Sequence, residues 1–555
     1  MRNRIFCLLL LAFAVAVTYA NTLHGEFVFD DSRIYNNPAL RITSLDWHSL
    51  AGAALQSEPA TRPVANLTFA LNYYLHGDRV EGYHLVNILI HLATAFFLYL
   101  LIDVTLRTPA LAGQATKAGR APGGRLAPEW LAFFAALLWL VHPVQSQSVA
   151  YVVQRMNSLA AMFYLVSLYC YVRCRLDPGG PARCRFFFAA SGVAGVLAMG
   201  CKEISITLPL FILLYEWYFL EDLDLGWLRR RALPIGLVVA VLAGLALLML
   251  GGHPVERILA GYQGRPFTPG QRLLTELRVV FFYLSLLVFP HPSRLNLDHD
   301  FAVSTSLLQP PTTLAAGVGL LVLLGVAVWS ARRERLLSFA ILWFLGNLLV
   351  ESSLLGLELV FEHRLYLPAM LLFAVAVAGV DRLLSSRRAK ALLLVGLAVL
   401  LGLWTVERNR VWHDRVSLWS DCVAKSPGKA RPHNNLGVAL KRRGRLREAA
   451  EQYRMVIAMD PDFIEAYNNL GNVLLETGQP DQALLYYGKA LDAVPDQPVI
   501  HNNMGKALLA KHRYDRAMMH FAEALRLKPD FAEARENLGR ARWLWRRANE
   551  GQPGR

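Results

Sequence analysis

Two adjacent carboxylates near the N-terminus are the residues best placed to do chemistry. Asp30 and Asp31 follow the apolar sequence Phe27-Val28-Phe29, shortly after the first hydrophobic run. Paired acids in an apolar setting at a membrane surface can supply a general base that takes a proton from a hydroxyl group. An ordinary turn or a helix cap is the plainer interpretation of such a pair.

Further ionisable residues stand at the ends of later hydrophobic runs. Cations there could neutralise a phosphate while a carboxylate accepts a hydroxyl proton. His84 and His91 are two helical turns apart but lack a third ligand nearby, so we expect neither a metal site nor another cofactor. The candidates for binding a phosphate or a substrate are Arg62, His84, Arg155, Lys202, Glu203 and Arg364.

The elements that must position these residues are long apolar runs. The chain is 54% hydrophobic and 18% charged, and the runs end near Thr405. Runs of about 20 residues can satisfy their own backbone hydrogen bonds in lipid, so they predict spanning helices. We place spans near 5–22, 83–103, 129–145, 157–172, 186–201, 204–220, 233–250, 312–330, 336–350, 365–381 and 390–406. The run 277–290 is ambiguous.

The basic residues predict how these spans are oriented. Many of the basic residues behind the formal charge of +15 stand in five short clusters between the runs, which favours membrane orientation over a nucleic-acid partner. If 277–290 enters the membrane and returns, the clusters at 107–125, 173–185, 229–231, 332–335 and 382–390 all face the cytoplasm. This arrangement gives eleven crossings, a cytoplasmic N-terminus and an outer C-terminal part. The first run could instead be a cleavable signal peptide, and the next segment is outside in either case.

The C-terminal part repeats every 34 residues. The sequence Asn434-Asn435-Leu436-Gly437 recurs at 468, 502 and, with Glu536 first, at 536. This period is typical of tetratricopeptide repeats. One asparagine per repeat could grip an extended peptide backbone, or could simply satisfy local backbone groups. These candidate acceptor-binding residues are Asn435, Asn469, Asn503 and Asn537.

The expected fold is therefore all-α, a polytopic helix bundle followed by an α-solenoid. We expect a membrane domain over 1–406 with a first outer loop at 23–82. A connecting half-repeat follows at 407–429, then a repeat domain at 430–547 and a tail at 548–555. The six cysteines show neither zinc-ligand nor disulfide-framework spacing.

A series of motifs in fixed order gives the sequence a family resemblance. The series resembles the TMTC proteins, which carry transmembrane and tetratricopeptide-repeat segments, from about residue 20 to 545. Its members here are Phe27-Val28-Phe29-Asp30-Asp31, Arg62-Pro63, Tyr83-His84-Leu85-Val86-Asn87, His142-Pro143-Val144, Lys202-Glu203, Leu295-Asn296-Leu297-Asp298 and Arg364-Leu365-Tyr366-Leu367-Pro368.

The resemblance implies an inverting glycosyltransferase of the C superfamily. Its relatives are protein O-mannosyltransferases that use a polyprenyl-phosphate sugar, with Asp30 and Asp31 at the positions that supply the base. It also implies that Lys202 and Arg364 neutralise phosphate, while Glu203 positions the acceptor or Lys202. The composition looks bacterial, which implies an undecaprenyl carrier, the inner membrane and a periplasmic repeat domain.

Together, these features predict a membrane enzyme that moves a mannose-like hexose to a hydroxyl acceptor, Ser or Thr of proteins held by the repeats. The alternative is a non-catalytic, membrane-anchored repeat scaffold for envelope protein assembly. Such a scaffold needs the repeats but not the acids.

Overall fold

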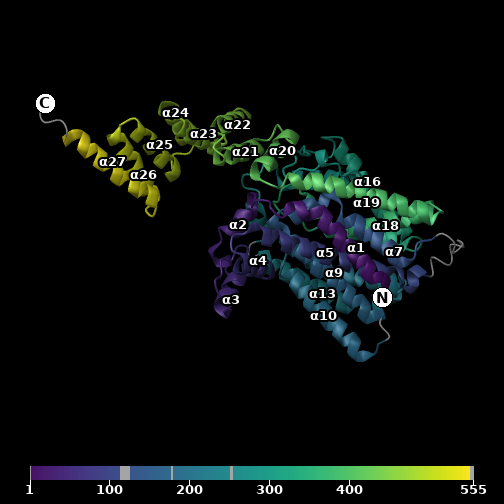
Figure 1. Cartoon of the computed structure of the whole chain (residues 1–555). Helices are drawn as coiled ribbons and strands as arrows, with labels where there is room; N and C mark the ends of the chain where they lie inside the picture. The colour runs from purple at the N-terminus through teal and green to yellow at the C-terminus, as the bar shows by residue number, and fades with distance from the viewer. Residues whose placement is uncertain (1, 113–124, 177–178, 251–253, 551–555) are drawn as a thin grey trace. The chain divides into compact units, whose positions relative to one another are not determined.

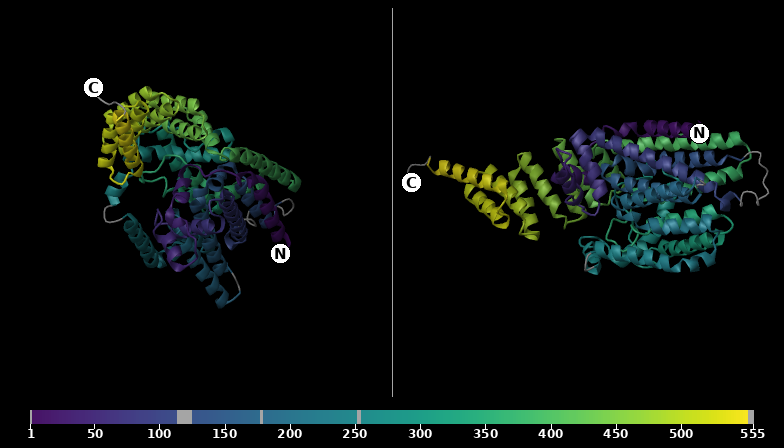
Figure 2. Two further views of the ribbon diagram at one scale, coloured as in Figure 1. Left: turned by 60° about the vertical axis from the view of Figure 1, so that its left-hand side comes forward. Right: turned by 90° about the horizontal axis from the view of Figure 1, so that it is seen from below.

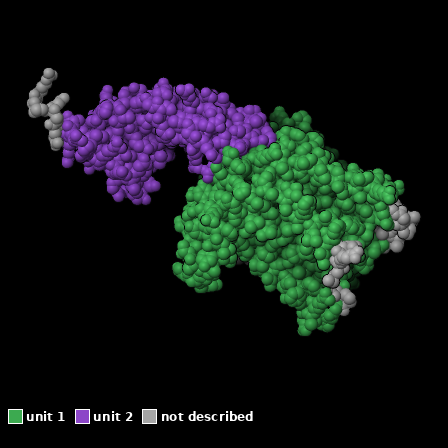
Figure 3. Space-filling view, in the orientation of Figure 1, with its two compact units in different colours: residues 1–297, 301–414 green, residues 298–300, 415–555 purple. Residues whose placement is uncertain are grey.

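The computed structural model describes residues 2–112, 125–176, 179–250 and 254–550. Part of the basic cluster at 107–125 and the end of the predicted tail lie outside these residues. The described chain is helical without any strand, and it divides into two compact units. Unit 1 comprises residues 1–297 and 301–414, and unit 2 comprises 298–300 and 415–555 (Figure 3). The predicted all-α class is confirmed, whereas the predicted domain boundaries stay predictions.

Unit 1 contains a helix at every predicted span. Seven helical segments among the described residues are long and apolar enough to cross a membrane, and three apolar helices are shorter. The chain is therefore a multi-pass membrane protein, while the number of crossings stays a prediction. The helices are α1 (Arg2–Tyr19), α5 (Val80–Leu106), α7 (Pro128–Leu140), α9 (Arg155–Leu176), α10 (Pro181–Met199), α11 (Leu208–Tyr215), α13 (Ala232–Leu250), α15 (Pro269–Val288), α16 (Thr312–Ser330), α17 (Arg335–Leu348), α18 (Met370–Leu383) and α19 (Arg387–Arg410).

The ambiguous run lies in a helix longer than expected. Helix α15 has 20 residues and starts with a capping box between Thr268 and Gln271. Its N-terminal half carries Arg272 and Glu276, both buried and 2.8 Å apart as an ion pair. These charges interrupt the apolar pattern, which is why hydropathy located only the C-terminal part of the helix.

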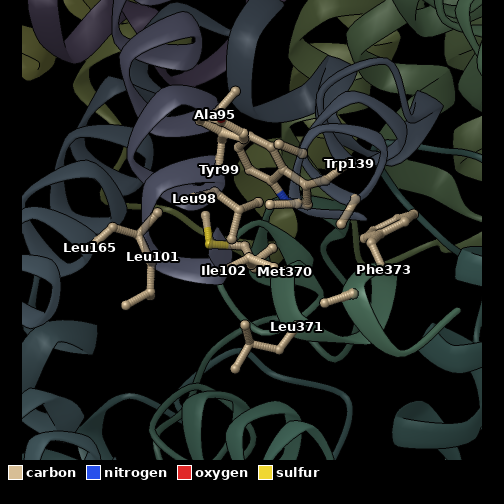
Figure 4. Close-up of a cluster of buried hydrophobic side chains, with 14 of the residues drawn as sticks. Ala95, Leu98, Tyr99, Leu101, Ile102, Trp139, Leu165, Met370, Leu371 and Phe373 are labelled. Atoms are coloured by element: carbon tan, nitrogen blue, oxygen red, sulfur yellow. The ribbon is translucent and has the colours of Figure 1, made fainter. Parts of the chain in front are cut away.

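Large apolar side chains fill the interior of the helix bundle. Trp139, Tyr99 and Met370 are fully buried in one cluster that α5, α7, α9 and α18 share (Figure 4). Helices α1 and α19, far apart in sequence, pack side by side (Figures 1 and 2). Leu321 of α16 and Leu392 of α19 are exposed, as expected for helices whose outer faces contact lipid.

The segment between α1 and α5 forms a small helical layer of its own. It holds the short 3₁₀ helix η2 (Phe29–Asp31), α2 (Ser32–Tyr35), α3 (Trp47–Leu55) and α4 (Pro63–His76). Phe69 and Ala53 are buried in its core together with residues from the start of α9. The predicted acid pair therefore sits on a packed platform rather than on an isolated loop.

One cysteine pair departs from the sequence expectation. Cys174 near the end of α9 and Cys184 at the start of α10 form a disulfide across the turn between these helices. The remaining four cysteines are buried and lie outside disulfides.

Unit 2 is a row of antiparallel helix pairs, ending in the yellow helix α27 of Figure 2. A methyl group on Gly471 would lie 2.5 Å from the Tyr487 ring, so only glycine allows the two helices of that repeat to approach so closely. Gly444 and Gly478 turn between helices at φ +75°, and His512 takes the same turn at φ 58°. The helices are α20 (Arg415–Lys425), α21 (Ala430–Arg442), α22 (Leu446–Met459), α23 (Ile464–Glu476), α24 (Pro480–Ala493), α25 (Pro498–Ala510), α26 (Tyr514–Leu527) and α27 (Ala532–Glu550).

Candidate active site at the start of helix α9

Polar groups from separate segments meet at the residues that begin α9. Residues 153–157 cover about 6 Å along a helix axis, so groups that contact them lie around one helical turn. Three contacts define the meeting point: Val153 N–H to Asp31 Oδ1 at 2.7 Å, Arg62 Nη1 to Met156 Sδ at 3.3 Å and Lys202 Nζ to Asn157 Oδ1 at 3.0 Å.

The two acids of the predicted pair have different environments. Asp31 is fully buried, and its second oxygen accepts the Val28 N–H at 2.9 Å. The side chain of Asp30 is 36% exposed, with Arg33 at 3.4 Å. Asp31 therefore fixes the local backbone, and Asp30 is the acid that a substrate can reach.

The backbone next to Asp30 is strained, and Tyr151 holds it through a hydrogen bond. Phe29 adopts φ +44°, a left-handed conformation that is costly for an aromatic residue. The Asp30 N–H donates to Tyr151 Oη at 2.9 Å, and the Tyr151 ring stacks on Trp412 at 5.4 Å. Burial, together with the nearby Asp30 and Asp31, raises the pKa of Tyr151 well above its usual value. The phenol therefore stays neutral beside the acids.

Arg62 and Glu203, both predicted site residues, form a two-pronged ion pair. Arg62 Nη2 lies 2.9 Å from Glu203 Oε2, and its Nε donates to both carboxylate oxygens at 3.2 Å. Thr61 Oγ1 donates to Glu203 Oε1 at 2.9 Å. Both charged side chains are partly exposed. Glu203 thus orients the guanidinium while leaving one side of it open to an anion.

Lys202 lies deeper, between two acceptors. Its Nζ donates to Glu351 Oε1 at 2.8 Å in addition to Asn157. Burial lowers the pKa of Lys202, and the Glu351 carboxylate opposes part of that lowering. Burial alone would raise the pKa of Glu351, but Lys202 and Arg364 hold it below its usual value. The pair therefore persists as a buried ion pair.

Arg364 belongs to the 3₁₀ segment η9 (Glu362–Leu365), which reaches the same place. The Asn157 Nδ2 donates to the His363 carbonyl at 2.9 Å, so the first turn of α9 holds η9 as well as Lys202. Arg364 Nη2 and Nη1 donate to the carbonyls of Glu358 and Leu359 at 2.7 and 3.0 Å. The side chain is buried.

Arg155 links three helices. It is fully buried, and each guanidinium nitrogen has an acceptor. Its hydrogen bonds join α4, α5 and α9, and its predicted phosphate contact stays a prediction. The acceptors are Asn87 Oδ1 at 2.8 Å, Thr68 O at 3.2 Å, Asn72 Oδ1 at 2.7 Å and Tyr83 O at 2.9 Å.

His84 is also buried, and its ring lies against the backbone that precedes the acids. A methyl group on Gly25 would be 3.2 Å from His84 Nε2. The predicted substrate contact of His84 is not supported by this position. Among the described residues, no three His, Cys, Asp or Glu side chains lie together as metal ligands would.

Two members of the site were not predicted from the sequence. Glu351 directly follows a predicted span, so the rule that ionisable residues gather at span ends could have found it. Asn157 lies inside an apolar helix, and nothing in its spacing points to Lys202.

The predicted acceptor-binding asparagines bond to one another along the array. Three of the four donate their side-chain amide to the first asparagine of the preceding repeat: Asn469 to Asn434 at 3.1 Å, Asn503 to Asn468 at 2.9 Å and Asn537 to Asn502 at 2.9 Å. Asn503 is only 5% exposed, whereas Asn435, Asn469 and Asn537 are partly exposed. One donor of each linking carboxamide is thus used within the array.

The C-terminal repeats match a known family. The family model for the tetratricopeptide repeat covers residues 434–498 and 502–547. Among solved structures, the first repeat domain of Spaghetti (RPAP3) bound to an HSP90 peptide is 19% identical, covering 21% of this chain and 91% of that chain with a TM-score of 0.21. A MamA structure from Desulfovibrio magneticus is 17% identical, covering 24% and 82%, with a TM-score of 0.21.

The relatives that match about 80% of this chain are all named protein O-mannosyl-transferases. Protein O-mannosyl-transferase Tmtc3 of Drosophila melanogaster is 26% identical over 81% of this chain and 54% of that protein. TMTC4 of Mus musculus is 27% identical over 80% and 65%, and TMTC1 of Homo sapiens is 28% identical over 81% and 55%. The chain is thus TMTC-like, and its matches span between about half and two thirds of these relatives' lengths.

Proposed function

We propose that this TMTC-like chain is a membrane glycosyltransferase that moves a mannose-like hexose from a polyprenyl phosphate to a serine or threonine hydroxyl of a protein. The relatives' names support sugar transfer to protein. One structural observation carries the proposal: the segment 151–157 at the start of α9 contacts the acid pair, with Asp30 partly exposed, and also contacts two cation–carboxylate pairs.

The reaction is a direct displacement with inversion. Asp30 takes the proton of the acceptor hydroxyl, whose oxygen forms a bond to the anomeric carbon of the sugar. The bond between that carbon and the phosphate oxygen breaks, and the polyprenyl phosphate leaves with the electron pair.

Cations stabilise the charge that develops on the leaving phosphate. Arg62, Lys202 and Arg364 supply three positive charges against the two negative charges of Glu203 and Glu351. The product monoester carries more negative charge than the phosphodiester donor, so the same cluster favours the product side of the transfer.

The repeat domain presents the protein acceptor. Its partly exposed carboxamides, Asn435, Asn469 and Asn537, are available to an extended peptide, since a carboxamide can both donate to and accept from a backbone. The bilayer supplies the lipid-linked donor to the helix bundle. No metal or other cofactor is required in this scheme.

Replacing Asp30 by asparagine in cells tests the proposal. We expect D30N to reduce glycosylation of envelope proteins by about 100-fold or more while expression persists, because the proton acceptor is lost. The matched control is D78N, since Asp78 is an exposed carboxylate of the same outer segment that pairs with Arg41. Unchanged glycans in D30N contradict the proposal. A phenotype that survives D30N and disappears on deletion of residues 430–545 supports the scaffold alternative instead.

A further inference from the structure

We infer that Glu351 is a positioning residue, which holds Lys202 charged and aims one of its N–H groups at the donor phosphate. This inference rests on the proposed function and adds to it a residue that neither the motif order nor the relatives' names assign.

The first step is the geometry around the ammonium group. A lysine ammonium has three N–H donors. Two are used, toward Glu351 Oε1 at 2.8 Å and Asn157 Oδ1 at 3.0 Å. With two directions fixed by partners on different segments, Asn157 in α9 and Glu351 in the turn after α17, the third N–H has a defined direction. The Lys202 side chain is 9% exposed.

The second step is that both partners are themselves held in place. Asn157 donates its amide to the His363 carbonyl, so its oxygen must face Lys202. The Glu351 carbonyl accepts from Arg272 Nη2 at 2.7 Å, which ties the backbone of Glu351 to α15. Neither acceptor can follow a lysine that swings away, and the ammonium therefore stays at one position.

The third step is the charge balance in this buried place. Arg62 lowers the pKa of Lys202 further, whereas Glu203 raises it. His363 is kept neutral, because burial, Lys202 and Arg364 all lower its pKa. Glu351 is thus the carboxylate in direct contact with Lys202, and its removal leaves a buried lysine that releases its proton more readily.

The sign of the expected pH effect follows from this balance. Transfer needs the protonated lysine, so activity is lost as the pH rises through the pKa of Lys202. When Glu351 is neutralised, that pKa falls and the loss begins at a lower pH. A residue with a purely structural role would instead reduce activity by the same factor at every pH.

The experiment compares E351Q, E351D and E358Q in the full-length protein, purified in lipid nanodiscs. Glu358 lies in the same loop, but its side chain pairs with Arg265 and not with Lys202. The probes are polyprenyl phosphate for binding and a polyprenyl-phosphate hexose for transfer, both measured from pH 6 to 9.5.

We expect E351Q at pH 9 to bind and transfer about tenfold less than it does at pH 7, relative to the wild type at the same pH values. E358Q should keep the wild-type profile. E351D keeps the charge but moves it away by one methylene group, so it should show a smaller shift in the same direction. If E351Q does not fold, E351D decides the question.

Three results would overturn the inference. E351Q or E351D with an unshifted alkaline limb shows that Lys202 does not depend on Glu351, and an equal shift in E358Q shows a general effect of loop charge. A wild-type protein that neither binds polyprenyl phosphate nor transfers sugar contradicts the proposed function itself, and the inference with it.

Discussion

At the residue scale, the two acids near the N-terminus have different tasks although they are adjacent and chemically identical. Asp31 caps the backbone, and Asp30 faces outward from a strained turn. The sequence predicted the pair but could not assign the roles, because the assignment depends on the Val153 amide, which is brought there from 122 residues away.

The different environments of the two acids predict that D31N lowers stability and that D30N does not. D31N should lower the free energy of unfolding by about 2 kcal/mol, because a buried carboxylate that accepts two backbone N–H groups loses its charge. D30N should leave stability unchanged, since its carboxylate is partly exposed. Thermal unfolding of both variants in the same detergent measures this, and equal melting temperatures would contradict the assignment.

Site residues could be predicted from the sequence where their position at the end of a span or in the motif series was enough to identify them. Arg62, Lys202 and Glu203 could be named from span ends and motif order, and the structure brings them together. Arg155 and His84 carried the same pattern but are buried in packing contacts. Glu351 follows a predicted span and Asn157 lies inside an apolar helix, but their contacts with Lys202 arise only when the turn after α17 and the start of α9 meet the Lys202 segment.

At the element scale, the start of α9 organises the site. Arg155 joins this turn to α4 and α5 through carbonyl and carboxamide acceptors spread over both helices. A planar guanidinium reaches such acceptors from fixed directions, whereas an ammonium concentrates its donors at one point. Arg155 therefore fixes the start of α9 against α4 and α5.

We predict that R155K is not a conservative change. It should lower the free energy of unfolding by about 3 kcal/mol, because buried carboxamides of Asn72 and Asn87 lose their partners. Transfer should fall as well, because Arg62 is the N-cap of α4 and is displaced when that helix loses its contact with α9. Unfolding and transfer assays on R155K, beside R79K at an exposed arginine as control, measure both effects. A variant indistinguishable from the wild type would show that α9 is held by other contacts.

Helices could be predicted from the sequence where a repeat period or the length of an apolar run was clear. The 34-residue repeat predicted the helix pairs of unit 2, and apolar length predicted a helix at every span. The prediction was incomplete at α15, because Arg272 donates to the carbonyls of Ser353, Leu357 and Glu358, which makes a buried charge tolerable in a helix. A loop 80 residues away cannot be inferred from local hydropathy.

At the scale of the whole molecule, the orientation of the bundle decides whether the acids and the repeats share one side of the membrane. Helix α15 is long enough to cross, yet it buries two charges. The predicted topology, with all five basic clusters inward, has α15 enter the membrane without adding a crossing. That topology predicts that the repeat domain and Asp30 share one side of the membrane.

This topology predicts that a reporter fused near Arg415 is active outside the cytoplasm. A second reporter in the loop at 229–231 should be active inside, because that basic cluster faces the cytoplasm in the same arrangement. Alkaline phosphatase and a fluorescent protein, used at both positions, report opposite compartments. A cytoplasmic result at Arg415 would separate the repeats from the acids and contradict the combined mechanism.

The central claim, that Asp30 serves as the base in sugar transfer from a lipid phosphate to protein, is tested most directly with purified components. Wild-type protein, D30N and D78N are reconstituted with a labelled polyprenyl-phosphate hexose and a serine- and threonine-rich peptide, and the labelled peptide is quantified by mass spectrometry. The account predicts labelled peptide with the wild type and D78N, and at least about 100-fold less with D30N. Equal labelling by D30N, or none by the wild type, would contradict it.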